Sequence, residues 1–369
     1  MLLLRHINRR LHQLYSPPSV KHIAEKCLYG EEHHIVSPRA KIIIRSDIFM
    51  KIRATDMLDF PACNVLNGFL YGINCNSPTA KMCIIVDEDE QKVEVCCRKL
   101  AKKSDFHCEL QVPFQSILNI ASSNSIAIYN LQSEEIKVNA RKNIYVHNIR
   151  GKIVELLSIT GNIDCSMFMV YTTLMETGGN GHIYLKKAQG TRLECKTSEG
   201  NIKIGSSYVL STKFNTDNGK VDLRNVHKKT EVFIHGRGDL IMSSFNGVLT
   251  VNSNGGSISL DFIQVKQENV ITADKASKAT LYISEPIAKN VFMKVTGCKV
   301  NLDDTLAYLC RSLNKEKNAF QLSTEEEKNN KLLITTKNAH VILGTITWLE
   351  SMMLAISLEN KSMPKKYIF

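Results

Sequence analysis

The most regular feature of the chain is a short motif that recurs six times between Gly161 and Leu260: glycine, a polar residue, an aliphatic residue, any residue and an apolar residue. The glycines are 18 to 20 residues apart, at Gly161, Gly181, Gly200, Gly219, Gly238 and Gly256. Such an even period is typical of a repeat architecture, in which each copy of the motif forms one structural unit.

Within each copy, the aliphatic and the apolar residue are two positions apart, which places both on one face of a β-strand. These inward positions hold only Ile, Val, Leu, Met or Cys, whereas the outward positions are mixed and mostly polar. A second apolar alternation follows about ten residues later in several copies, at residues 193–195, 212–214, 232–234 and 249–251. The pattern therefore predicts at least two short strands in each unit.

A unit of about 19 residues cannot bury its apolar face alone, but units stacked with like strands in parallel share one continuous core. We therefore predict an all-β fold, a parallel β-solenoid that resembles a single-stranded β-helix. Its rungs begin with residues 126–128 and 144–146, which gives about eight rungs before Leu260. In this fold Ile202, Val221 and Leu240 stack in one inward column.

Glycine and the Asn-Gly pairs at 218–219 and 246–247 suit the corners of such a stack, where a positive φ or a close backbone approach disfavours a β-carbon. Asn-Gly is also the strongest short signal for a β-hairpin. An up-and-down antiparallel sheet is therefore the competing prediction.

The repeats are flanked by less regular sequence on both sides. We expect a smaller β-rich region at 25–104, with strands at 41–45, 48–52, 82–86 and 92–96 and a long irregular connection at 54–80. The solenoid is assigned to 105–305. Residues 306–369 are expected to form a charged loop, solvated at 311–331, and a C-terminal capping segment. The apolar stretch 341–358 has Glu350 at its centre, which favours a closing strand or a capping helix over a membrane span.

The first 24 residues form a candidate targeting segment. They contain no acidic residue, and on a helix their apolar side chains share one face, away from Arg5, Arg9 and His12. This is the pattern of a mitochondrial presequence, so we expect import to the mitochondrial matrix and cleavage between residues 15 and 35. An ordinary surface helix is the alternative.

The composition of the chain limits which classes of partner are expected. The chain is 43% hydrophobic and 22% charged, and its formal net charge is +11, of which Arg5, Arg9, Arg10 and Lys21 supply four. The remaining basic residues are interspersed with acids and form no stripe with aromatics, so nucleic acid is not an expected partner. The 11 cysteines include no Cys-x-x-Cys, which indicates reduced thiols and no zinc site. Cys165 and Cys195 are expected to be small buried hydrophobes.

One family resemblance rests on two features: the Cys-Glu-Leu-Gln-Val-Pro segment at 108–113, and the Gly-x-Ile-x-Ile rungs that follow it. In these features the chain resembles the "putative adhesin" β-strand-repeat family of bacterial surface proteins, which also has an animal branch of unassigned function. The resemblance covers roughly residues 105–300. It implies a β-solenoid fold, and it implies no catalytic, cofactor-binding or metal-binding residues.

Two functional classes follow from this fold. The first is a non-enzymatic binding or scaffolding protein that uses the solenoid flank to bind a protein partner, with no cofactor. The second is a polysaccharide-active β-helix enzyme, a lyase or hydrolase, which needs clustered carboxylates. Its nearest candidates are Asp222 and Asp239 on adjacent rungs, with Asp164 further away. These aspartates fit a solvated outer face better, so the sequence favours the first class and predicts no catalytic residue.

Overall fold

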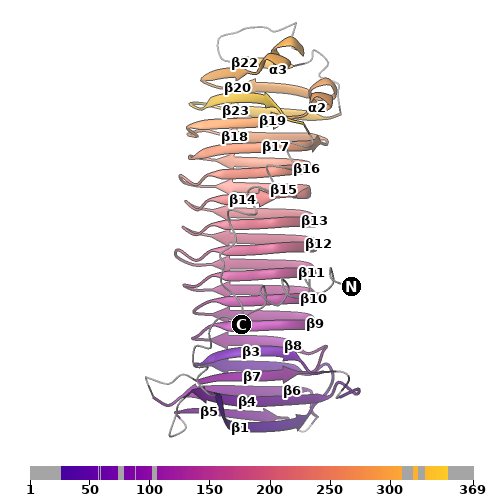
Figure 1. Cartoon of the computed structure of the whole chain (residues 1–369), viewed down its shortest axis with the longest axis vertical. Coiled ribbons are helices and arrows are strands. Elements are labelled where there is room, and N and C mark those ends of the chain that lie inside the picture. Colours follow the sequence, from indigo (N-terminus) through magenta and orange to yellow (C-terminus); the bar gives the residue numbers. More distant parts are fainter. Residues whose placement is uncertain are drawn as a thin grey trace, which may run out of the picture.

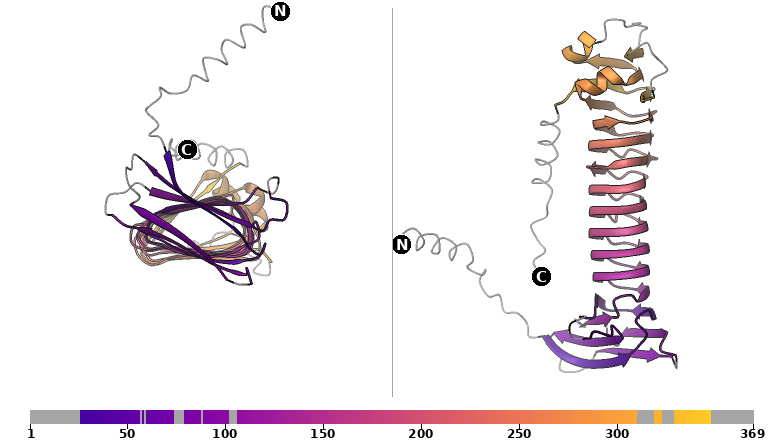
Figure 2. Two further views of the ribbon diagram at one scale, coloured as in Figure 1. Left: turned by 90° about the horizontal axis from the view of Figure 1, so that it is seen from below. Right: turned by 90° about the vertical axis from the view of Figure 1, so that its right-hand side faces the viewer.

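The computed structural model describes residues 26–56, 58, 60–73, 79–87, 89–101, 106–309, 319–322 and 329–347. In the described chain, 24 strands form one continuous sheet that winds into an elongated stack (Figure 1). Viewed along its long axis, the stack is a flattened oval (Figure 2). The rungs pair in parallel through the repeats, so the predicted β-solenoid is confirmed and the antiparallel alternative is wrong.

Each central rung is one long strand. These strands are β9 (Ile126–Ala140), β10 (Ile144–Ser158), β11 (Ile163–Thr177), β12 (Ile183–Thr197) and β13 (Ile202–Thr216). The expectation of two short strands in each unit is therefore wrong here, because the parallel ladder follows the chain around its bends. The next rung does divide, into β14 (Val221–Arg224) and β15 (His227–Ile234), before β16 (Leu240–Ser253).

The predicted inward column is confirmed. Ile202 pairs with Ile183 on one side and with Val221 on the other, and Val221 pairs with Leu240. Ile202, Val221 and Leu240 are each 0% exposed. The same register continues to Met50 near one end of the stack and to Val300 at the other, so one apolar column runs through the molecule.

The motif glycines also form a column, and they are required by close packing. A β-carbon on Gly200 would overlap the carbonyl oxygen of Gly181, and one on Gly219 would overlap that of Gly200. Among the six motif glycines only Gly256 has a positive φ, of 74°. The period of the sequence therefore reflects backbone approach between rungs more than turn conformation.

The N-terminal region begins the stack. Strands β2 (Lys41–Ser46) and β3 (Phe49–Ala54) pair in parallel with β8 (Ile117–Ser122) and β9, so one ladder joins the N-terminal region to the repeats. Below them lie β6 (Lys92–Lys99) and β7 (Phe106–Val112). The strands predicted at 41–45, 48–52, 82–86 and 92–96 are all present.

Residues 54–80 are not simply an irregular connection. They contain β4 (Val65–Ile73), which pairs antiparallel with β1 (Lys26–Ile35) and β7. Two glycines of this stretch, which in sequence are typical of a loop, lie beneath large side chains: Gly68 under Met82 and Ile84, and Gly72 under Phe106. Strands β1, β4 and β5 (Ala80–Val86) thus cover the N-terminal end of the core, which would otherwise expose apolar side chains.

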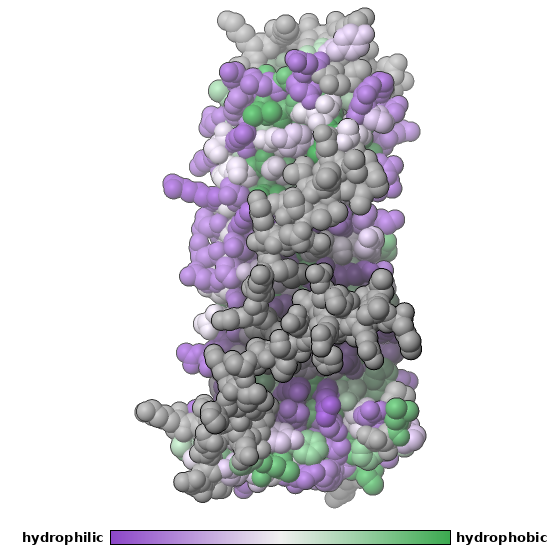
Figure 3. Space-filling view, in the orientation of Figure 1, coloured by the Kyte–Doolittle hydropathy of each residue, from purple (hydrophilic) through white to green (hydrophobic). Residues whose placement is uncertain are grey.

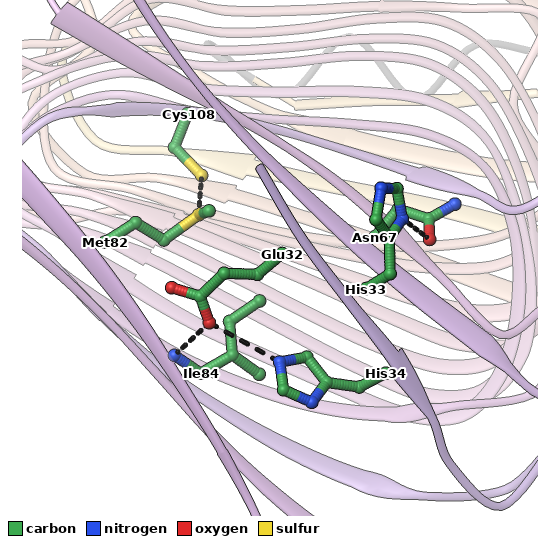
Figure 4. Close-up of polar contacts among 7 residues, drawn as sticks. All are labelled: Glu32, His33, His34, Asn67, Met82, Ile84 and Cys108. Atoms are coloured by element: carbon green, nitrogen blue, oxygen red, sulfur yellow. Dashed lines mark hydrogen bonds and ion pairs between the residues drawn. The ribbon is translucent and has the colours of Figure 1, made fainter. Parts of the chain in front are cut away.

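Polar contacts tie this cover together (Figure 4). The Glu32 carboxylate accepts a hydrogen bond from the backbone N–H of Ile84 at 3.1 Å and lies 3.4 Å from Nε2 of His34. Nδ1 of His33 lies 2.8 Å from the side-chain oxygen of Asn67. These contacts join β1 to β4 and to the edge of β5, so we assign them a structural role.

The C-terminal rungs are interleaved. After β17 (Ser257–Val265), β18 (Glu268–Ala273) and β19 (Lys278–Ile283), the chain forms α2 (Glu285–Asn290), β20 (Phe292–Thr296), β21 (Lys299–Leu302) and α3 (Asp304–Leu309). It then returns, so that β23 (Lys331–Thr336) lies between β18 and β20, and β24 (His340–Thr345) lies between β19 and β21.

This interleaving corrects two expectations. The apolar stretch from residue 341 begins in β24, an interior strand and not a closing one, because β21 lies beyond it. The solvated loop expected at 311–331 contains β22 (Ala319–Leu322), which pairs antiparallel with β20. No helix within the described residues is long and apolar enough to cross a membrane. The targeting segment 1–24 and residues 348–369 lie outside the described residues.

Candidate functional site

The polar position of the repeat motif holds neighbouring rungs together. Oδ1 of Asn162 accepts a hydrogen bond from the backbone N–H of His182 at 2.9 Å. Nδ1 of His182 accepts one from Asn201 at 2.8 Å, and Oδ1 of Asn201 accepts one from Lys220 at 2.9 Å. Each side chain thus satisfies a backbone donor of the next rung, which gives this column a structural role.

Two of the three aspartates proposed from the sequence take part in similar contacts. Asp239 accepts hydrogen bonds from the backbone N–H and the hydroxyl of Ser257, at 2.7 and 2.8 Å. Asp222 accepts two bonds from the guanidinium of Arg224, at 3.1 and 3.0 Å, and Arg224 is only 4% exposed. In the register Asp222 pairs with Ile241, so the ladder does not oppose it to Asp239.

Asp164 lies in the same outward row as Asp222, with Tyr184 and Lys203 between them. Three steps of about 4.8 Å between strands separate their backbones by about 14 Å. The two carboxyl groups of a glycosidase are about 5 to 9.5 Å apart. Burial raises the pKa of Asp164, but the row brings no second carboxylate close to it.

The buried cysteines have no chemical role that the structure supports. Cys165 and Cys195 are 1% and 0% exposed, and burial raises the pKa of each thiol well above its ordinary value. Thiols that remain protonated are poor nucleophiles, so the prediction of small buried hydrophobes is confirmed. Within the described part of the chain, no three His, Cys, Asp or Glu side chains are grouped so that they could hold a metal ion.

A different surface, on β11 and β13, exposes large apolar side chains from regular strands. The exposed fractions are 44% for Met167, 43% for Met169, 63% for Tyr171, 48% for Tyr208 and 55% for Leu210. We call these five residues the Met–Tyr face. The repeat motif does not reveal this face, because these five residues lie outside the outward positions beside each motif.

The row that crosses the Met–Tyr face is free of acidic side chains. In register order it holds Arg150, Met169, Gln189, Tyr208, His227 and Asn246. The rings of Tyr208 and His227 stack with centroids 4.7 Å apart and planes 14° apart. Nζ of Lys187 lies 5.9 Å from the centroid of the Tyr208 ring. The face therefore joins apolar and basic groups on a rigid backbone.

Further apolar side chains are exposed singly elsewhere on the central rungs: Ile153 at 39%, Leu157 at 38%, Ile159 at 52% and Leu174 at 37%. In the view of Figure 3, hydrophilic side chains cover the left-hand edge of the stack, and apolar ones gather toward its two ends. On the outward side of the C-terminal half of each central rung, charged pairs such as Lys196 with Glu176, at 3.0 Å, join neighbouring rungs. Such solvated ion pairs are ordinary for a surface. The Met–Tyr face is the more distinctive candidate for a binding surface.

Comparison with known proteins finds solved structures and one family model that match parts of the chain. Solved structures that match include a "putative cell adhesion protein" from Clostridium sporogenes, at 12% identity over 86% of this chain and 99% of that chain, with a TM-score of 0.17. A "putative adhesin" from Parabacteroides merdae matches at 11% identity over 71% and 95%, with a TM-score of 0.37. Another "putative adhesin", from Bacteroides fragilis, matches at 9% identity over 88% and 99%, with a TM-score of 0.27.

All three of these proteins are bacterial, so they do not test the expected animal branch. No curated protein matches the chain. The β-solenoid expected from the family resemblance is the fold observed. Residues 161–341, which hold the repeats and most of the C-terminal rungs, match the family model described as Toastrack DUF4097.

Proposed function

We propose that the chain is a non-enzymatic binding or scaffolding protein, and that it docks a partner protein on the Met–Tyr face. The observation that carries the proposal is the exposure of five large apolar side chains on two well-paired strands, β11 and β13. Large exposed apolar side chains mark interaction sites when they cluster. Because the rungs are fixed on both sides, the face is already ordered before binding, which reduces the entropic cost of association.

The alternative, a polysaccharide-active enzyme, has less support. Asp222 and Asp239 have structural partners, and the Asp222–Asp164 distance does not suit an acid and base pair. Non-enzymatic binding therefore agrees best with the arrangement of the carboxylates.

The docking proposal is tested by affinity purification of the tagged full-length chain from cells. The double variant Tyr171→Ser and Leu210→Ser removes two anchors of the face, and we expect it to recover at least tenfold less of any specific partner. The matched control is Ile85→Ser, since Ile85 on β5 is 61% exposed and lies outside the face. Equal recovery by both variants, with melting temperatures unchanged, would overturn the proposal.

We also propose that the protein acts in the mitochondrial matrix. The support is the acid-free, amphipathic, arginine-bearing composition of residues 1–24. The test compares fluorescent fusions of the whole chain and of a chain that lacks residues 2–24. Import of the first and loss of import of the second are expected, whereas a cytosolic signal from both would contradict the proposal.

A further inference from the structure

A pocket of about 360 Å³ opens beside the basic end of the Met–Tyr face. Its walls include Tyr208, His227, Lys228, Asn246 and Lys266, which come from the β13, β15 and β16 rungs and from the turn after β17. The volume lies at the lower end of the roughly 300 to 1,000 Å³ that small-molecule sites occupy. The pocket is therefore large enough for a small ligand and too small for a folded partner.

The backbone explains why a pocket forms here. Gly247 contributes no side chain, and a β-carbon on it would overlap the backbone of Lys228. Lys228 itself has a positive φ of 71°. The pairing of β16 with β17 shifts register at Phe245 and Asn246, beside the pocket. The pocket thus lies where a missing side chain and an irregular register coincide.

The charges in the pocket are positive and largely uncompensated. Within the described residues, neither Lys228 nor Lys266 has an ion pair or a side-chain hydrogen bond, whereas the neighbouring Lys229 lies 2.8 Å from Glu231. No acidic side chain of the described ranges lines the pocket. Burial, together with the charges of Lys228 and Lys266, lowers the pKa of His227 and so favours its neutral imidazole. The ammonium groups of Lys228 and Lys266 therefore give the pocket a positive electrostatic potential.

We infer that this pocket binds a phosphate group carried on a small planar ring. Two long, flexible lysines that approach from different rungs suit a doubly charged oxyanion, which each of them contacts as a point charge. Asn246 and His227 offer further polar atoms beside them. The His227 ring stacks on Tyr208 with one face, so its other face is the one against which a planar group can pack. Anion binding in the purified protein needs no protein partner, so this inference and the docking proposal fail independently.

The test is a calorimetric titration of the purified full-length chain with phenyl phosphate, alongside inorganic phosphate and benzyl alcohol. We expect saturable binding of phenyl phosphate, weaker binding of inorganic phosphate, and none of benzyl alcohol. Affinity should fall as salt rises, because exposed charges are screened. Absence of saturable phenyl phosphate binding, or equal binding of benzyl alcohol, would overturn the inference.

Single substitutions test whether phenyl phosphate binds in this pocket. Lys228→Gln and Lys266→Gln should each weaken phenyl phosphate binding about tenfold, which is about 1.4 kcal/mol. Asn246→Asp keeps the side-chain shape but adds a negative charge beside the lysines, and it should weaken binding at least as much. The matched control is Lys275→Gln, which removes an exposed charge outside the pocket and should leave affinity unchanged. Equal affinity in all four variants would show non-specific attraction and overturn the assignment.

A further titration with vesicles that contain phosphatidic acid identifies the source of the phosphate. Vesicle binding that is lost in Lys228→Gln would show that the pocket binds the phosphate of a lipid headgroup, and it would support the inference. Vesicle binding that persists in that variant, without phenyl phosphate binding by the wild type, would overturn it.

Discussion

The stacked core makes a specific prediction at Ile202. Its side chain is 0% exposed and lies in the ladder between Ile183 and Val221. Replacing it with aspartate removes about 1.5 to 3 kcal/mol of apolar burial. It also places a carboxylate where it has no partner, at a further cost of several kcal/mol. The total approaches the roughly 5 to 15 kcal/mol that stabilises a typical domain.

Because each rung is stabilised mainly by its two neighbours, Ile202→Asp should open several rungs together. Thermal unfolding followed by circular dichroism should show a large loss of melting temperature. Hydrogen exchange should show faster exchange in β12, β13 and β14. Lys203→Asp is the matched control, since Lys203 lies next along the strand and points outward. Equal losses of melting temperature for the two variants would refute the assignment of the inward column.

Three further predictions concern the glycine column, the loss of stability at acid pH and the aspartates. Gly200→Ala should strongly destabilise the folded chain, because the added β-carbon would overlap the backbone oxygen of Gly181, and this oxygen cannot move without shifting a rung. An unchanged melting temperature would contradict the close packing of the glycine column. The contacts with His107 and Lys51 hold the pKa of Glu109 at about 2, below its ordinary 4.5. Its stabilising contribution should therefore be present above pH 4.5 and be lost as pH falls toward 2, and Glu109→Gln should flatten this part of the stability curve. Asp222→Asn should lower the melting temperature, because it weakens the bidentate contact with the buried Arg224. We expect no glycan-cleaving activity to depend on Asp222. A lyase or hydrolase activity that disappears in this variant would restore the enzyme alternative.

The repeat could be predicted from the sequence because one physical constraint recurs in every rung. A glycine is needed where backbones approach, as at Gly200, and an apolar residue is needed two and four positions later, as at Ile202 and Ile204. These requirements leave a fixed period in the sequence. Strand β4 cannot be recognised from the sequence, because Gly68 and Gly72 are typical of a loop, whereas in the fold they make room for the side chains of neighbouring strands.

The Met–Tyr face could not be predicted in the same way. The burial pattern of β11 alternates, but the alternation is interrupted around Met167 and again around Tyr171, where the strand bends. A shift of one residue reverses which side chains face the core, so Met169 and Phe168 cannot be assigned to the outside and the inside from spacing alone. The position of β23 and β24 inside the stack was equally hidden, because it depends on pairing with strands far away in the sequence.

The central claim is that the chain binds its partner through the Met–Tyr face of a rigid solenoid. The most direct measurement is photo-crosslinking in cells, with benzoylphenylalanine placed singly at Tyr171, Tyr208 or Tyr308. All three side chains are exposed, but Tyr308 lies on α3, at the C-terminal end of the stack. We predict one discrete crosslinked species shared by positions 171 and 208 and absent from position 308. No adduct at 171 and 208, or the same adduct at 308, would contradict the claim.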